Sequence, residues 1–308
     1  MSQTGIVLGD FGWYSPAQVR GIARVEADEV YVLAVLCWEL LHGRALRDRE
    51  GVFETLNALI RGELPVPLVR PEAAALEPVL TAALALEREA RPATVGALAE
   101  TLEAAVRPAE AATVGAWIAA ALPAWVSQQR ALVEFAAAFP TPKRGWIEVG
   151  APWDGTLGQT TLVVEGRDGA RRLIAVTRPH GMMLDDHEVH RQLAREASAD
   201  DIVRERDGGL ALVHRFVPGV EAVQLRDAGA CAPPDVAVAI VAAAARALAA
   251  RLTSGETRMM AMSLEPGELH IGDDGSVWWT RIGPAPMPRP VTPPEPAERV
   301  ARGKRPRW

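Results

Sequence analysis

The sequence predicts an α+β protein with a helical half first and a strand-rich half second, on three observations. Residues 1–108 carry apolar residues at helical spacing, interrupted by breaks that contain Pro or Gly. Residues 146–283 carry short β-branched runs bounded by turn signals. The Ala-rich stretch between them, residues 109–145, again has helical spacing and is expected to be a helical linker. A chain of 308 residues is long enough to bury a large core.

The helical half is expected to hold one buried helix and three amphipathic ones. Residues 29–41 are apolar almost all round and end before Gly43, which is typical of a helix buried on every side. Residues 51–60, 71–86 and 94–106 have the spacing of helices with a single apolar face.

The strand-rich half is expected to begin with three strands and to end with a hairpin. The strands cover residues 146–149, 160–165 and 172–177, the last two joined by a GRDG turn. The elements expected after them are a helix at 185–198, a strand at 209–216, a helix at 235–251 and a hairpin that turns at 273–275. Because neighbouring strand residues face opposite sides, at most one of Trp278 and Trp279 can enter a pocket, and we expect the inward one to pack in the core.

The composition indicates which cellular environment and which kinds of partner to expect. The 39 acidic and 33 basic residues give a net charge of -6, so nucleic acid is not expected as a partner. The basic residues near the end lie in residues 284–308, a Pro-rich stretch expected to be an extended tail. Two cysteines are too few for a disulfide framework, and no segment has the length or apolarity of a signal peptide or a membrane span. We therefore expect a cytoplasmic protein with no membrane partner.

Two parts of the chain carry motifs of one known family. FGWYSPAQVRG (residues 11–21), EVYVLAVLCWELLHGR (29–44) and REARPATVGALAETLEA (88–104) resemble the end of the activation segment, the buried helix and the closing helix of bacterial eukaryotic-type serine/threonine protein kinases. LVHRFVPGV (212–220) and LEPGELHIGDDGSVWWTRIG (264–283) resemble the hinge and the catalytic-loop hairpin, which come earlier in that family. The resemblance implies a kinase-like bilobal fold with its halves in reversed order.

Three arrangements satisfy this order. In a circular permutation, residues 109–145 bridge the end of the ordinary fold back to its beginning, and a helix of about 25 to 30 residues reaches roughly 40 Å. The chain could instead hold two remnants of a tandem pair, or a homodimer could exchange halves. Permutation is favoured because neither half repeats the other and together they make one fold's worth of elements.

The resemblance also marks the positions that phosphoryl transfer requires, and they are replaced. Thr177 stands at the place of the phosphate-binding lysine, and Ser263 at that of the Asp that accepts the substrate proton. Glu265 stands for the usual lysine of the catalytic loop, and Glu268 for the metal-binding Asn.

The two remaining positions of the resemblance, 281 and 196, affect the charge of the site. Arg281 stands where the Asp of the DFG triplet would bind Mg²⁺, and a permanent cation there would repel the ion. Glu196 corresponds to the carboxylate partner of the missing lysine, so we hypothesise that Arg281 pairs with Glu196, Glu268 or both. The alternative is that these are solvated charges at a drifted site. The family's Glu that pairs with Arg91 is replaced by Ala17, so Arg91 must find another acceptor or solvent.

These replacements predict a catalytically inactive kinase-like protein, a pseudokinase, that acts as a protein-binding or regulatory module. No catalytic residue, metal or cofactor is expected, and the partner is expected to be a protein. A different reading is an enzyme that still binds a nucleotide and uses it for an atypical phosphoryl or nucleotidyl transfer. A third is a remnant without a selected function.

Overall fold

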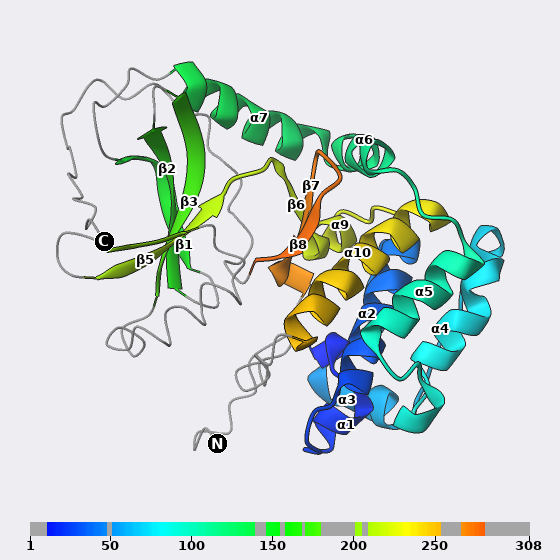
Figure 1. Ribbon diagram of the computed structural model, residues 1–308. Helices are drawn as coiled ribbons and strands as arrows, with labels where there is room; N and C mark the ends of the chain where they lie inside the picture. Colours follow the sequence, from blue (N-terminus) through cyan, green and yellow to red (C-terminus); the bar gives the residue numbers. More distant parts are fainter. Residues whose placement is uncertain are drawn as a thin grey trace.

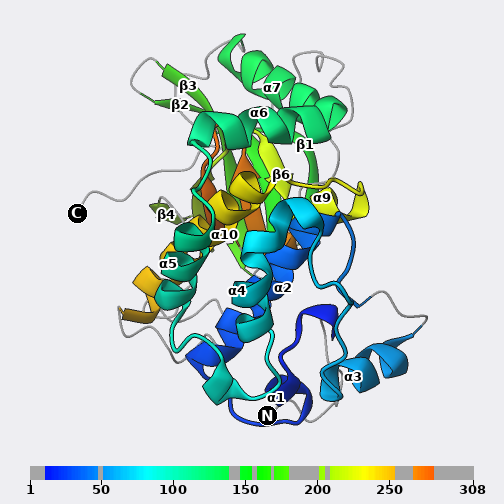
Figure 2. The same ribbon diagram turned by 90° about the vertical axis from the view of Figure 1, so that its right-hand side faces the viewer.

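The computed structural model describes residues 11–47, 51–138, 146–154, 158–167, 170–179, 201–204, 209–253 and 266–280. It contains a helical part and a part built on a five-stranded sheet, as Figure 1 shows, which confirms the predicted α+β class. Two helices, α6 (Ala111–Ala121) and α7 (Pro123–Ala138), lie along the side where the two parts meet (Figures 1 and 2).

The helical part is centred on α2 (Glu26–His42). Every residue of α2 from Asp28 to Leu41 is buried, because the sequence is apolar around most of the helix. Gly43 ends the helix in the left-handed conformation, with a φ of 62°, and donates its N–H to the Glu39 carbonyl. The other elements of this part are η1 (Phe11–Trp13), α1 (Pro16–Val19), α3 (Val52–Ile60), η2 (Pro71–Leu76), α4 (Glu77–Ala83), η3 (Arg88–Ala90) and α5 (Val95–Ala105).

One helix prediction is wrong in detail. Residues 71–86 do not form a single α-helix but the 3-10 helix η2 followed by α4. Pro78 lies in the first turn of α4, where its missing N–H removes no intrahelical bond, whereas the same residue deep inside a longer helix would remove one.

The five-stranded sheet has the order β1-β2-β3-β5-β4, and all its neighbouring strands are antiparallel. The strands are β1 (Trp146–Asp154), β2 (Gly158–Arg167), β3 (Ala170–Pro179), β4 (Asp201–Arg204) and β5 (Leu210–Arg215). The predicted hairpin is confirmed, since Arg167 is paired with Ala170 at the end of β2 and β3. β1 is longer than predicted because it continues past a register shift between Val149 and Trp153. The helix predicted at 185–198 lies outside the described residues.

The chain then returns to the helical part through a second, three-stranded sheet of order β6-β7-β8. The elements are β6 (Gly219–Glu221), α9 (Ala222–Asp227), α10 (Pro234–Thr253), η5 (Pro266–Glu268), β7 (Leu269–Gly272) and β8 (Val277–Trp279). α10 packs against α2 and α5, so one apolar core contains residues from both halves of the sequence, such as Leu33 and Val241. Trp279 is buried in this core and donates its indole N–H to the Ala244 carbonyl at 3.1 Å, while Trp278 is only partly buried. This is the division of the two tryptophans predicted above.

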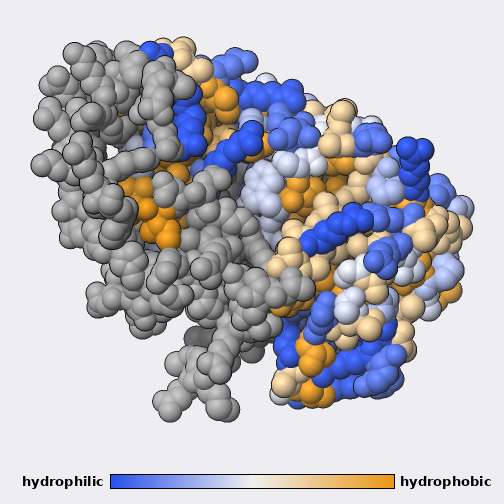
Figure 3. All heavy atoms as spheres, in the orientation of Figure 1, coloured by the Kyte–Doolittle hydropathy of each residue, from blue (hydrophilic) through white to orange (hydrophobic). Residues whose placement is uncertain are grey.

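On the face in Figure 3, hydrophobic areas are interspersed among hydrophilic residues over the helical part. Large hydrophobic residues exposed on this part include Val52, Phe53 and Ile60 of α3. Among the helices that the structure describes, none combines the length and the apolarity that a membrane crossing would need.

Candidate functional site

A void lies where the five-stranded sheet meets β6, β7 and α7. It is small, with a volume of about 30 Å³ for water-sized molecules, and it is partly open to solvent. The residues around it come from α7, from both sheets and from the segment between β5 and β6: Gln129, Trp153, Ala175, His214, Arg215, Phe216, Val217, Glu221, His270, Trp278 and Thr280. Most of its wall area is apolar, but six of these eleven residues have polar or charged side chains.

Thr177 lies on β3, two residues after Ala175, which lines this void, but Thr177 itself is buried inside the sheet. It is fully buried, and its hydroxyl lies 2.8 Å from that of Thr160 on the neighbouring strand β2. One hydroxyl donates to the other within the strand pair. Thr177 therefore carries no charge, and its hydroxyl is bonded to Thr160 inside the sheet.

One polar side chain of the wall is that of His270. Its Nε2 lies 3.1 Å from the Val217 carbonyl, and because a carbonyl only accepts, Nε2 carries the hydrogen in this contact. Its Nδ1 lies 3.4 Å from Oε1 of the buried Glu221, and its ring is 4.5 Å from that of Trp278. The imidazole thus occupies a backbone acceptor of the segment between the two sheets that a ligand could otherwise use.

Glu268 is the second predicted site residue that the structure describes. It ends the 3-10 turn η5, is buried, and accepts the N–H of Thr280 at its carbonyl at 2.7 Å. The backbone just before position 281 therefore lies beside Glu268. Glu196, Ser263, Glu265 and Arg281 lie outside the described residues, so the hypothesis that Arg281 pairs with Glu196 or Glu268 stays a prediction.

Among the described residues, no group of three or more His, Cys, Asp or Glu side chains is placed to hold a metal ion.

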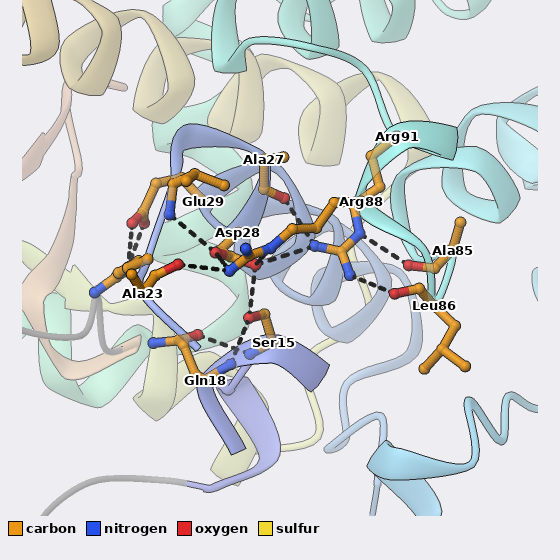
Figure 4. A network of polar contacts seen from close by, with 12 residues as sticks. Ser15, Gln18, Ala23, Ala27, Asp28, Glu29, Ala85, Leu86, Arg88 and Arg91 are labelled. Atoms are coloured by element: carbon orange, nitrogen blue, oxygen red, sulfur yellow. Dashed lines mark hydrogen bonds and ion pairs between the residues drawn. The ribbon is translucent and has the colours of Figure 1, made fainter. Parts of the chain in front are cut away.

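Figure 4 shows a buried ionic network in the helical part, around Asp28, Arg88 and Arg91. Asp28 is completely buried in the first turn of α2 and accepts hydrogen bonds from the Ser15 hydroxyl at 2.8 Å and from Arg88 at 2.5 and 3.1 Å. Burial alone would raise the pKa of Asp28, but the bonds from Arg88, the Val25 N–H and Ser15 outweigh it and lower the pKa below its usual value. Asp28 is therefore ionised at neutral pH.

The Asp28 carboxylate is also an acceptor for Arg91. The Arg91 side chain is fully buried, with Nη1 3.3 Å from Asp28 Oδ1, and it donates to three carbonyls, those of Ala27, Ala85 and Leu86. Desolvation lowers the pKa of Arg91, and the charge of Asp28 partly offsets this. From the sequence we expect Arg91 to find another acceptor or solvent, and the structure shows acceptors. Asp28 was not identified from the sequence, although the available signal was a second acid beside Glu29 at the start of the most apolar helix.

Comparison with known proteins gives one partial match. The chain is similar to the tyrosine-protein kinase MasK of Myxococcus xanthus (strain DK1622), with 35% identity over 104 residues. The match covers 33% of this chain and 16% of MasK. No family model matches the chain, and no solved structure matches it. The similarity indicates a relationship to kinases over a third of the chain, and because so little of MasK is covered, it does not transfer the activity of that protein.

Proposed function

We propose that this chain is a kinase-like protein with its halves in permuted order, that it has lost phosphoryl transfer, and that it serves as a protein-binding or regulatory module. The observation that carries the proposal is the state of Thr177. Phosphoryl transfer depends on positioning and electrostatics, and a cation must grip the phosphates. A neutral threonine, buried in the sheet and bonded to Thr160, cannot do this.

Other described groups around the void also favour the loss of phosphoryl transfer. The Val217 carbonyl and Glu221 Oε1 both lie beside the His270 ring, so these three groups contact one another. Glu268, which replaces an amide in the resemblance, is buried, and its carbonyl accepts the Thr280 N–H. The residues at positions 196, 263, 265 and 281 enter the proposal from the sequence alone.

Permutation within one chain is supported by the shared core. Because α10 packs on both α2 and α5, the two halves of the sequence need one another to bury their apolar surfaces. Two tandem remnants would be expected to have separate cores. An exchanged dimer would make the same contacts between chains, so light scattering after size exclusion distinguishes them: we expect the 33.0 kDa monomer mass, and a dimer of twice that mass would favour exchange.

The binding role is supported by α3. Val52, Phe53 and Ile60 expose 52%, 73% and 39% of their surfaces and project from one side of this helix. Exposed aliphatic and aromatic residues gathered on one element are typical of protein interaction sites.

Thermal melting with Mg²⁺-ATP tests the loss of catalysis. A ligand at a hundred times its Kd stabilises a protein by about 2.7 kcal/mol, so we expect no shift in Tm across a wide titration. We also expect no transfer of label from γ-³²P-ATP to any protein. Labelling that is abolished by Glu268→Gln or Glu196→Gln would refute the proposal and favour the atypical transferase. A shift in Tm without labelling would mean that nucleotide binding outlived catalysis.

A further inference from the structure

Helix α7 satisfies both backbone groups of Gly219, in the segment that connects the five-stranded sheet to the helical part. Gln129 Oε1 accepts the Gly219 N–H at 2.7 Å, and the Trp125 indole N–H donates to the Gly219 carbonyl at 3.0 Å. Trp125 and Gln129 are four residues apart, so they lie on one face of α7, and both are buried. Since the other edge of β6 pairs with β7 at Gly272, α7 takes the place of a neighbouring strand.

The second half of α7 is attached to the five-stranded sheet. Leu132 and Ala136 belong to an apolar cluster with Leu162 of β2 and other sheet residues. Arg171 of β3 donates to the Ala137 carbonyl at 3.0 Å. This end of the helix is therefore attached to the sheet.

The helix before it is attached to the helical part. Val114 and Ile118 of α6 are buried in the core shared by α2, α5 and α10. Gly115 lies so close to the β7–β8 turn that an added Cβ would be 2.1 Å from the Asp273 carbonyl oxygen. Arg130 of α7 also pairs with the Asp273 carboxylate at 2.6 Å. Residues 111–138, which we call the strap, are thus fixed at one end to the helical part and at the other to the sheet (Figures 1 and 2).

Two rigid parts joined by a single short segment can rotate about it, whereas an element packed on both parts and bonded to that segment opposes the rotation. We propose that the strap locks this joint, with the two bonds to Gly219 as the closing contacts, so that the sheet and the helical part keep one relative orientation. The void is lined by Gln129, Phe216 and Val217, and its shape is set by the same contacts. This inference does not depend on the loss of catalysis.

Hydrogen exchange tests the closing contacts directly. Gln129→Leu keeps the size of the side chain and removes the acceptor of the Gly219 N–H. Amide exchange in a peptide covering residues 216–221 should become roughly three- to tenfold faster, the effect of about one hydrogen bond. Glu134→Leu, an exposed polar-to-leucine change on the same helix, should leave that rate unchanged. Equal rates in the two variants would overturn the proposal.

Distance measurement tests the lock itself. Spin labels on the exposed Cys231 and on Gln159→Cys, an exposed position of β2, report the separation of the two parts, while the fully buried Cys37 stays unlabelled. In the Trp125→Phe, Gln129→Leu double variant the distance distribution should become at least about twofold wider. An unchanged width in the folded double variant, checked by circular dichroism, would overturn the proposal. If the double variant does not fold, Trp125→Phe alone decides the matter, because it removes only the indole donor and keeps a ring in place.

Discussion

Replacing Asp28 by Asn removes one buried charge from the network at the start of α2. The variant keeps the shape of the side chain but leaves the fully buried Arg91 without an ionised partner. Breaking a buried ion pair by neutralising one member costs about 3–5 kcal/mol. Arg91 keeps its three carbonyl acceptors, and the Arg88 side chain is 21% exposed and can turn to water, so we expect the lower end, about 3 kcal/mol.

The matched control is Glu103→Gln, which neutralises the partner of Arg246 on the surface between α5 and α10. The Arg246 side chain is 57% exposed, and exposed pairs are worth about 0–1 kcal/mol. Urea titrations followed by circular dichroism at 222 nm compare the two. With an m-value of about 3 kcal/mol/M, Asp28→Asn should lower the midpoint by about 1 M, and Glu103→Gln by less than about 0.3 M. Equal midpoints for the two variants would refute the reasoning that burial, and not the mere presence of an ion pair, sets the energy.

Three further outcomes follow from the structure. The folded pKa of Asp28 lies below its unfolded value of about 3.9, so its contribution to the unfolding free energy is complete above that pH and is lost as the pH falls through the folded pKa. The difference in unfolding free energy between wild type and Asp28→Asn should therefore be constant from pH 7 to about 5 and shrink below about pH 4. A thiol reagent at pH 8 should modify the exposed Cys231 in the native protein and Cys37 only after unfolding, because burial raises the Cys37 pKa to about 12, and rapid native modification of both would contradict this burial. Gly275→Ala should destabilise the protein by about 2 kcal/mol more than Gly21→Ala. Both residues have positive φ, but only at Gly275 would a Cβ meet backbone, 2.0 Å from a carbonyl oxygen of α6. Equal melting temperatures of the two variants would show that α6 does not pack against Gly275.

Much of the local structure could be predicted from the sequence alone, because it depends on residues that are near one another in the chain. The apolar run of α2 and Gly43 after it specify a buried helix and its end whatever surrounds them. The GRDG turn between two β-branched runs specifies the β2–β3 hairpin in the same way. Pattern reasoning failed where a short element has little pattern of its own, as in β4, β6 and α9, and at Pro78, where the second helix of a pair begins.

The tertiary structure alone decided which distant groups meet. Nothing near Arg91 in the sequence names Asp28 as its partner, since 63 residues separate them and several acids were available. Likewise, Trp125 and Gln129 read as ordinary members of an Ala-rich helix, and only the packing of α7 across the joint brings them to Gly219, about ninety residues later. Local sequence determines the conformation of each segment through sterics and periodicity. The pairing of buried polar groups depends on which segments pack together, because each group must find its partner wherever the shared core leaves one.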